Sequence, residues 1–239
     1  MSDQLKLRLL WTWCHISFIY SVLYSSNSLI VMSIVWAILI TMIGGYAGWH
    51  RYFTHRSFKT DKITEYIMFW FGVMLGLGRP IALIFFHRWH HAHSDTVDDV
   101  HSPNHLKWWQ VLLGYYNTPK ISRKYVKDII GDPKVKFAQR HYFKIHVIAH
   151  VVLLLIDPIL PGLVLASINL YAFYTTGSII NYLSHVGGSS NNNPILALVT
   201  LGEGWHKNHH DDSSRYSNQV KWYQWDPTGW VIKYFLKRD

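Results

Sequence analysis

The chain has almost no cysteine and few charged residues. A single cysteine among 239 residues excludes a disulfide framework, and it also excludes zinc ribbons and iron–sulfur clusters held by several thiolates. Any metal must therefore be held by histidine, carboxylate or water. Asp, Glu, Lys and Arg make up only 15% of the residues, against about 25% in an ordinary soluble domain. This shortage of charge, together with 49% hydrophobic residues, predicts an integral membrane protein.

Two long stretches contain no cation at all. All 23 Lys and Arg lie in residues 1–8, 51–144 and 207–239, which leaves residues 9–50 and 145–206 without them. Each of these stretches is long enough for two spans of about 20 residues, so the charge distribution predicts four transmembrane helices. A net charge of +9 would suggest nucleic acid in a soluble protein. Basic blocks that alternate with apolar stretches argue against a nucleic-acid partner here.

Turn residues divide each apolar stretch into two spans. A polar turn occupies residues 25–28, and Pro158 and Pro161 stop a helix in the second stretch. A further apolar stretch, residues 62–86, is predicted to form one or two interfacial helices, because a fifth span would put the histidine-rich segments on opposite faces of the bilayer. The four predicted spans are residues 9–24, 29–49, 143–156 and 163–183.

Lys and Arg accumulate on the cytoplasmic side of membrane proteins. This rule places every basic block and both termini in the cytoplasm, so we expect a multi-pass protein of a bacterial inner membrane or a eukaryotic endoplasmic reticulum. The predicted fold is a single all-α integral membrane domain over residues 1–239. Its four transmembrane helices carry a cytoplasmic helical cap, formed by residues 87–142 and 184–239, that holds a histidine-rich di-metal site.

Histidine is abundant, and it recurs in clusters with a regular spacing. Two triplets have i, i+3, i+4 spacing, which places three imidazoles on one face of a helix. A further pair is separated by five residues, about 140° on a regular helix, so both rings face one metal only if the helix ends or unwinds between them. The pair is His50 and His55, and the triplets are His87, His90, His91 and His206, His209, His210.

Two polar residues near the end of the fourth predicted span complete the candidate site. Asn181 and His185 are four residues apart and share a helix face, so His185 is a ninth candidate ligand and Asn181 a candidate holder of a metal-bound water. Nine imidazoles are too many for one tetrahedral zinc ion but suit two metal ions of higher coordination number. Ligand type alone fits iron, zinc, copper or nickel, and ligand number favours a di-iron centre that activates oxygen. Glu203 and Asp99 are expected to accept hydrogen bonds from ligand imidazoles.

These motifs resemble those of the membrane fatty-acid desaturases, and most of all the delta-9 acyl desaturases of the stearoyl-CoA type. The three boxes of that family, HxxxxH, HxxHH and HxxHH, are matched by the histidine pair and the two triplets. An additional Asn-x-x-x-His motif is matched by Asn181 and His185. The segment 222–228 resembles a tryptophan-rich stretch near the family's C-terminus, and the resemblance extends over about residues 30–236.

The resemblance implies an enzyme. Two iron ions, cycling between Fe2+ and Fe3+, and O2 would remove two hydrogens from a saturated fatty acyl chain and leave a cis double bond, with no catalytic residue beyond the metal ligands. The acyl group would be carried by coenzyme A or by a membrane lipid. Electrons would come from an external donor of the ferredoxin or cytochrome b5 type, since the sequence contains no His-Pro-Gly-Gly motif and no cysteine cluster.

Helix periodicity suggests where the acyl chain would lie. Counting back from His50 in steps of four residues gives Tyr46, Met42 and Ile38 on the same face of an α-helix. At 1.5 Å per residue the last two lie about 12 and 18 Å from the ligand, the depth that a methyl tail would reach. These three residues are predicted to line a substrate tunnel, and in the resembled family this helix is thought to set chain length.

Three alternatives remain at this stage. A related di-iron hydroxylase or ketolase would use similar histidines and differ only in its product. A zinc-binding or zinc-transporting membrane protein would hold zinc instead of iron and leave lipids unchanged. A catalytically inactive scaffold would be expected to lack ligands, whereas this sequence retains all nine.

Overall fold

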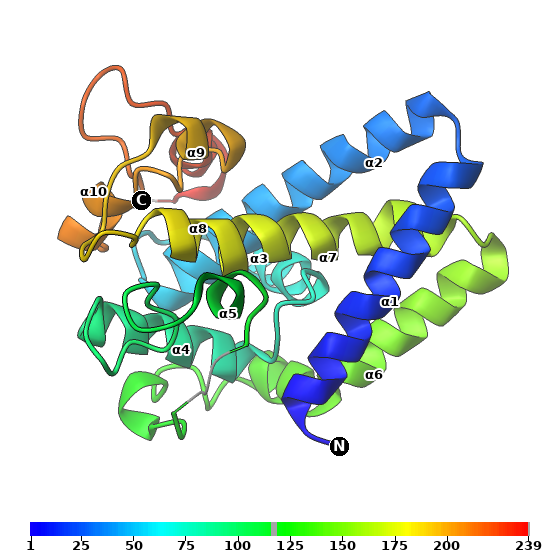
Figure 1. Cartoon of the computed structure of the whole chain (residues 1–239), viewed down its shortest axis with the longest axis horizontal. Coiled ribbons are helices and arrows are strands. Elements are labelled where there is room, and N and C mark those ends of the chain that lie inside the picture. The colour runs from blue at the N-terminus through cyan, green and yellow to red at the C-terminus, as the bar shows by residue number, and fades with distance from the viewer. Residues whose placement is uncertain (116–118, 239) are drawn as a thin grey trace.

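A computed structural model describes residues 1–115 and 119–238, and these residues form helices, turns and loops without any strand (Figure 1). The predicted all-α class is thereby confirmed. Residues 116–118 and 239 of the expected cap lie outside the described part. The α-helices are α1 (Asp3–Tyr24), α2 (Asn27–Ile40), α3 (Lys62–Met74), α4 (Pro80–His93), α5 (Trp108–Leu112), α6 (Pro133–Ile156), α7 (Ser167–Ala172), α8 (Ile179–Leu183), α9 (Pro194–Val199), α10 (His206–Asp211) and α11 (Pro227–Val231). Interspersed are a 3-10 turn, η2 (Arg123–Tyr125), and the π-helical segments η1 (Thr41–Thr54), η3 (Pro161–Ala166), η4 (Phe173–Ser178) and η5 (Ile232–Leu236).

Four long helical rods form two hairpins. The first hairpin joins α1 to the continuous rod α2–η1, and the second joins α6 to the rod that runs from η3 to α8. Ser26 caps the start of α2, because its hydroxyl accepts a hydrogen bond from the Leu29 N–H. The two hairpin turns lie at one end of the molecule, and α4, α8 and α10 lie toward the other (Figure 1).

Two of these rods are long and apolar enough to cross a membrane. They are Asn27–Thr54, with a mean hydropathy of 2.2, and Pro161–Leu183, with a mean hydropathy of 1.4. The remaining two predicted spans, residues 9–24 and 143–156, form the later parts of α1 and α6, which both begin within basic segments. The number of four spans stays a prediction.

The residue pattern of α1 is the reverse of that in a water-soluble helix. Its buried residues are the small Cys14, Ser17 and Ser21, whereas large apolar residues on the same helix, such as Ile19 and Leu23, are exposed. The Ser21 hydroxyl donates a hydrogen bond to the Ile159 carbonyl at 2.7 Å, which ties the two hairpins together. Small and hydroxyl side chains inside with large apolar side chains outside suit a hydrocarbon solvent.

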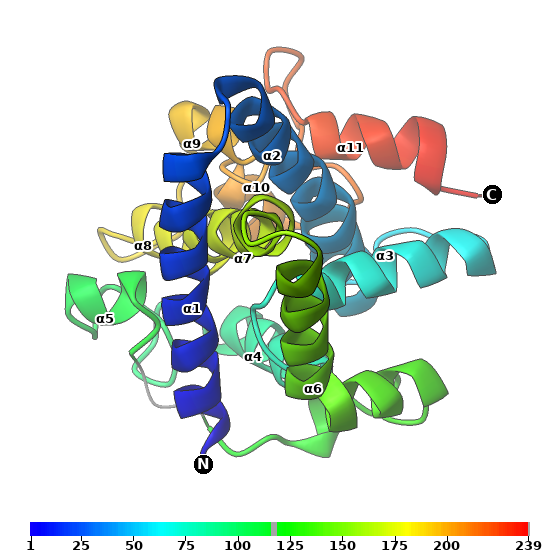
Figure 2. The same ribbon diagram turned by 90° about the vertical axis from the view of Figure 1, so that its right-hand side faces the viewer.

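The stretch predicted as interfacial, residues 62–86, forms two helices. These are α3 and the first half of α4, separated by a break at 75–79. α4 extends further than expected, to His93, because the first histidine triplet continues the helix. Figure 2 shows α3 lying crosswise to α6. The α3 backbone approaches η1 so closely that a Cβ on Gly44 would lie 2.5 Å from the Gly72 nitrogen.

Candidate metal centre

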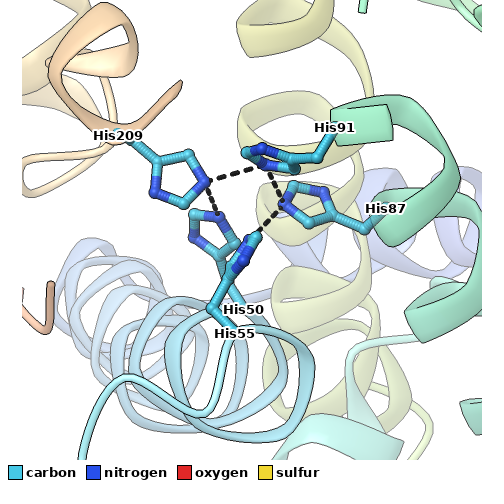
Figure 3. Close-up of side chains that lie close together, drawn as sticks. All are labelled: His50, His55, His87, His91 and His209. Atoms are coloured by element: carbon cyan, nitrogen blue, oxygen red, sulfur yellow. Dashed lines mark hydrogen bonds between the residues drawn. The ribbon is translucent and has the colours of Figure 1, made fainter. Parts of the chain in front are cut away.

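All nine histidines singled out from the sequence come together in two adjacent groups. The five-histidine cluster combines side chains from η1 and the residue that follows it, from α4 and from α10 (Figure 3), and the four-histidine cluster combines side chains from α4, α10 and the turn after α8. The imidazoles of His91 and His210 stack at 4.3 Å between ring centres, so the two clusters are neighbours. The first cluster consists of His50, His55, His87, His91 and His209, and the second of His90, His185, His206 and His210.

A π-helix brings the first histidine pair together. The amide of His55 donates to the carbonyl of His50 at 3.2 Å, which is the i to i−5 bond of a π-turn. The wider turn places residues five apart one above the other, and the two rings lie 5.1 Å apart. From the sequence, the helix was expected to end or unwind between His50 and His55. In the structure it continues as a wider π-helix.

Each histidine triplet is shared between the two clusters. On a helix, residue i+4 lies on one side of residue i and residue i+3 on the other. In α4, His87 and His91 therefore enter the five-histidine cluster while His90 enters the four-histidine cluster. In α10 the arrangement is reversed, since His206 and His210 enter the four-histidine cluster while His209 crosses to the other.

Carboxylates hold the outer nitrogen of one candidate ligand from η1, one from α4 and one from the turn after α8. The Nδ1 of His50 lies 2.8 Å from Glu203 Oε2, and the Nδ1 of His90 lies 3.0 Å from Asp99 Oδ1. These are the two acceptors expected from the sequence. A third acceptor was not foreseen: the Nδ1 of His185 lies 3.1 Å from Asp95 Oδ1.

The inner nitrogens have the arrangement that a cation requires. A neutral imidazole that donates from Nδ1 has only a lone pair on Nε2. The Nε2 atoms nevertheless face each other closely, at 2.9 Å between His50 and His209 and at 2.9 Å between His185 and His206. The candidate ligand atoms within each cluster lie within 4.8 Å of one another. Four or five imidazole nitrogens that converge around one point form a donor set suited to a metal ion, so the residues fit a metal in each cluster.

Burial favours the neutral form of several of these imidazoles. Burial, reinforced by the neighbouring histidines, lowers the pKa of His91 from 6.5 to about 3 and that of His210 to about 2. The pKa of His87, His206 and His209 is lowered for the same reasons. Neutral imidazole is the form that binds metal.

Arg51, next to the ligand His50, anchors the cluster to the C-terminal region. Its guanidinium is 1% exposed and lies 2.7 Å from Glu203 Oε1 and 2.9 Å from Asp226 Oδ2. Burial alone would raise the pKa of Glu203, but the charge of Arg51 outweighs it and lowers that pKa to about 2. Sequence reasoning missed Arg51 and Asp226, although a cation beside a ligand and an aspartate inside the tryptophan-rich segment were both visible.

A cavity of about 430 Å³ opens beside the clusters. Its lining combines apolar side chains of α1, η1, α4 and η4 with His50, His87 and His206, so candidate ligands face an apolar space. Asn181 also lines it, and its amide donates to the Gly177 carbonyl at 3.3 Å.

The three residues predicted to line a tunnel divide between two environments. Tyr46 lines this cavity, and its hydroxyl donates to Thr175 Oγ1 at 2.7 Å. Met42 and Ile38 do not line it. The prediction counted back from His50 in α-helical steps of four residues. The rod is π-helical from Thr41 onward, and in a π-helix the residues that share a face with His50 are spaced further apart in the sequence. For Met42 and Ile38 a role in substrate binding stays a prediction.

A third group of possible ligands adjoins the four-histidine cluster. His90, Asp99 and His101 offer atoms within 4.8 Å of one another, and all three are buried. Asp99 is already bonded to His90 Nδ1 at 3.0 Å and lies 3.8 Å from His101 Nδ1. This geometry favours a supporting role for Asp99 and His101 over a third metal.

Fold and site thus define a helical protein with paired histidine clusters beside an apolar cavity. No protein-family model matches the chain. It is 30% identical over 206 residues to an sn-1 stearoyl-lipid 9-desaturase of Anabaena variabilis, covering 80% of this chain and 74% of that protein. At this level of similarity the chain belongs to the fatty acyl desaturase family.

Other relatives carry the same family description. A probable chloroplastic lipid desaturase of Arabidopsis thaliana is 31% identical over 216 residues, which cover 84% of this chain. An acyl-CoA 5-desaturase of Anemone leveillei is 30% identical over 206 residues, which cover 80% of this chain. The chain spans only 59% and 64% of the lengths of these two proteins.

Proposed function

We propose that this protein is an oxygen-dependent membrane di-iron desaturase that introduces a cis double bond, at the delta-9 position, into a saturated fatty acyl chain. The observation that carries the proposal is the convergence of nine imidazoles, through their inner nitrogens, on two neighbouring points beside an apolar cavity. Membership of the desaturase family supports an oxidoreductase that acts on fatty acyl chains.

The overall reaction requires reductant from outside the chain. Reduction of O2 to two waters takes four electrons and four protons. Two electrons and two protons leave the acyl chain as its two C–H bonds break and the double bond forms, and an external donor and the solvent supply the rest. Two bound iron ions would supply the oxidising chemistry that unactivated methylene groups demand.

The chain's own residues would hold and shield the reactants. The five- and four-histidine clusters would hold one iron each, with Asn181 orienting a bound water. Glu203, Asp99 and Asp95 would keep three of the ligand imidazoles, those of His50, His90 and His185, in the tautomer that presents Nε2. The apolar walls of the cavity, to which Leu83 and Phe173 contribute, would fix the acyl chain and exclude water.

A four-span topology with both termini and the site in the cytoplasm is part of the proposal. It is supported by large exposed apolar residues along α1 and α6, including Ile16, Leu23, Val151 and Leu155, which lipid would cover. It is also supported by the basic residues around the histidine-bearing elements. The acyl group would reach the cavity while linked to a lipid or to coenzyme A, since relatives of both descriptions are similar to this chain.

Expression in a host that lacks its own desaturase tests the proposal directly. Gas chromatography and mass spectrometry of the total fatty acids should reveal a new cis monounsaturated species, with its double bond located by fragmentation. Hydroxylated or keto fatty acids would establish the hydroxylase or ketolase alternative instead. Purified protein that contains zinc and no iron, from cells with unchanged lipids, would refute the proposal in favour of a zinc protein.

A further inference from the structure

A second cleft, of about 480 Å³, lies in the C-terminal part of the chain. Its walls are the loop that precedes α11 and one face of α11–η5. The charged side chains that line it are Arg215, Lys221 and Lys233, and no carboxylate is among the described lining residues. The cleft is therefore a basic surface in a chain with few charges.

Aromatic side chains frame this cleft and remain exposed. Trp222 is 90% exposed and Tyr234 is 67% exposed, and both line the cleft. The ammonium groups of Lys221 and Lys233 lie over the rings of Tyr223 and Tyr234, at 5.8 and 5.1 Å. Exposed aromatic residues among cations are typical of protein interfaces with an acidic partner.

A continuous path of hydrogen bonds leads from the cleft wall to the five-histidine cluster. The carbonyl of Tyr216, which lines the cleft, accepts a hydrogen bond from Arg51 Nη1 at 2.9 Å. Arg51 Nη2 donates to Glu203 Oε1 at 2.7 Å, and Glu203 Oε2 lies 2.8 Å from His50 Nδ1. Two side chains thus separate the surface from a candidate metal ligand. Electron tunnelling falls steeply with distance, and it falls less along bonded atoms than across gaps.

We propose that this cleft docks a small acidic protein that carries one electron at a time, and that Arg51 and Glu203 lie on the electron's route to the metal centre. The inference rests on the proposed function, which requires two electrons from outside. Each docking event would oxidise one carrier by one electron, so two carriers would serve each acyl chain. The C-terminal segment lies at the end of the molecule away from the hairpin turns (Figure 1), where a soluble protein would have access.

Binding of a defined probe separates the proposal from the enzyme's activity. The probe is an oxidised, acidic plant-type [2Fe–2S] ferredoxin, titrated at low salt against metal-free protein in detergent. The double variant Lys221→Glu/Lys233→Glu is expected to weaken the Kd about tenfold or more, because two attractions become repulsions. Lys124→Glu is the matched control, since Lys124 is also exposed and also lies over a tyrosine ring, that of Tyr125 at 5.5 Å. The control should stay within about twofold of the parent.

A kinetic measurement on the iron-loaded enzyme adds a second readout. With ferredoxin as donor, the double variant should raise the KM for ferredoxin and leave the KM for the acyl substrate unchanged. Equal binding of ferredoxin by the parent and the double variant would overturn the proposal. A second outcome would also overturn it. If the parent protein is thermally more stable in phosphatidylglycerol nanodiscs than in phosphatidylcholine nanodiscs, and the double variant loses this difference while it binds ferredoxin normally, the cleft is a lipid contact. Charge-dependent ferredoxin binding without any lipid product would instead refute the proposed function alone.

Discussion

At the scale of single residues, the nine clustered histidines differ from the remaining histidines of the chain in what surrounds them. Their inner nitrogens face other inner nitrogens, as between His87 and His91 at 3.1 Å. By contrast His141 packs against Phe137 on the outside of α6. Metal binding should therefore depend on the nine clustered histidines and be indifferent to His141.

Replacement of one ligand in either cluster should empty that cluster. His209→Ala and His206→Ala are each expected to lose bound iron and to abolish activity, because a truncated ligand set loses affinity and leaves buried lone pairs unmatched. Iron is measured by inductively coupled plasma mass spectrometry on protein that elutes as a folded species in detergent. His141→Ala should keep its iron. Full activity in more than one ligand variant would contradict the assignment.

Asp95 should matter for metal affinity although it is not a ligand. Its carboxylate accepts the Nδ1–H of His185, so Asp95→Asn is expected to reduce metal affinity about 10- to 100-fold. Competition with a chelator of known affinity measures the change. Asp98→Asn, in the same loop with an exposed side chain, is the control and should match the parent. If Asp95→Asn and Asp98→Asn bind metal with the same affinity, Asp95 does not support the metal site.

The stability of metal-free protein should decline in mild acid. The folded pKa values of His91, about 3, and His210, about 2, lie below the unfolded value of 6.5, so the unfolded chain binds more protons between these limits. Stability therefore rises with pH across this window and is lost as pH falls below about 6.5. The thermal unfolding midpoint, compared at about pH 7.5 and about pH 5, measures it. A midpoint that is unchanged or higher in acid would contradict the prediction.

Residue patterns predicted all of the candidate ligand histidines, but only some of the residues that form hydrogen bonds to them or to their carboxylate partners. Six of the nine histidines could be identified from their i, i+3, i+4 spacing, His50 and His55 from their five-residue spacing, and His185 from its position four residues after Asn181. Glu203 was found because it lies three residues before a triplet, and Asp99 because it lies in the loop after one. Arg51 and Asp226 lie 175 residues apart, and no local pattern reports a contact over that distance.

At the scale of elements, the close approach of η1 and α3 fixes the position of the first histidine pair. Gly44 and Gly72 allow backbone-to-backbone contact, and a Cβ on Gly72 would also lie 1.8 Å from Trp49 Nε1. Any residue larger than glycine must separate the helices. The hydropathy of this stretch predicted a helix but could not distinguish a turn of four residues from a turn of five, because both bury one face.

Gly44→Ala tests this packing. The variant should be destabilised by about 1–3 kcal/mol, as overpacked cores usually are, and it should bind iron more weakly because His50 and His55 shift with η1. Thermal unfolding in detergent measures the first effect. Gly131→Ala is the control, since a Cβ there meets nothing within 4 Å, and it should be neutral or slightly stabilising. A Gly44→Ala variant as stable as the parent would mean that η1 and α3 can move apart freely.

At the scale of the whole molecule, side chains of α1, η1, α4 and η4 line an apolar cavity beside the candidate metal centre. Length, charge distribution and turns predicted the helical rods and their connections, because a helix satisfies its own backbone hydrogen bonds along long apolar stretches. The shape of the cavity was not predictable, since it depends on side chains contributed by segments far apart in sequence.

Gly177 offers a way to shorten the cavity without disturbing its walls. It lines the cavity, and a Cβ there would meet only Phe173 Cδ2, at 3.9 Å. Gly177→Leu should therefore shift the products toward shorter acyl chains while the protein folds normally. The chain-length distribution of the unsaturated products measures the shift. Unchanged products at normal activity would exclude this cavity as the acyl site, and a shift in Met42→Ala would extend the site beyond it.

The division of each histidine triplet between two clusters has a consequence for how the motifs are understood. A box in the sequence does not correspond to one cluster in the structure, because α4 and α10 each supply both clusters. A small rotation of either helix would move histidines of the two clusters in opposite senses, so that one cluster would tighten as the other loosened. Metal ions held in the two clusters would therefore be mechanically coupled, and the rotation of α4 and α10 would set their separation and relative affinities.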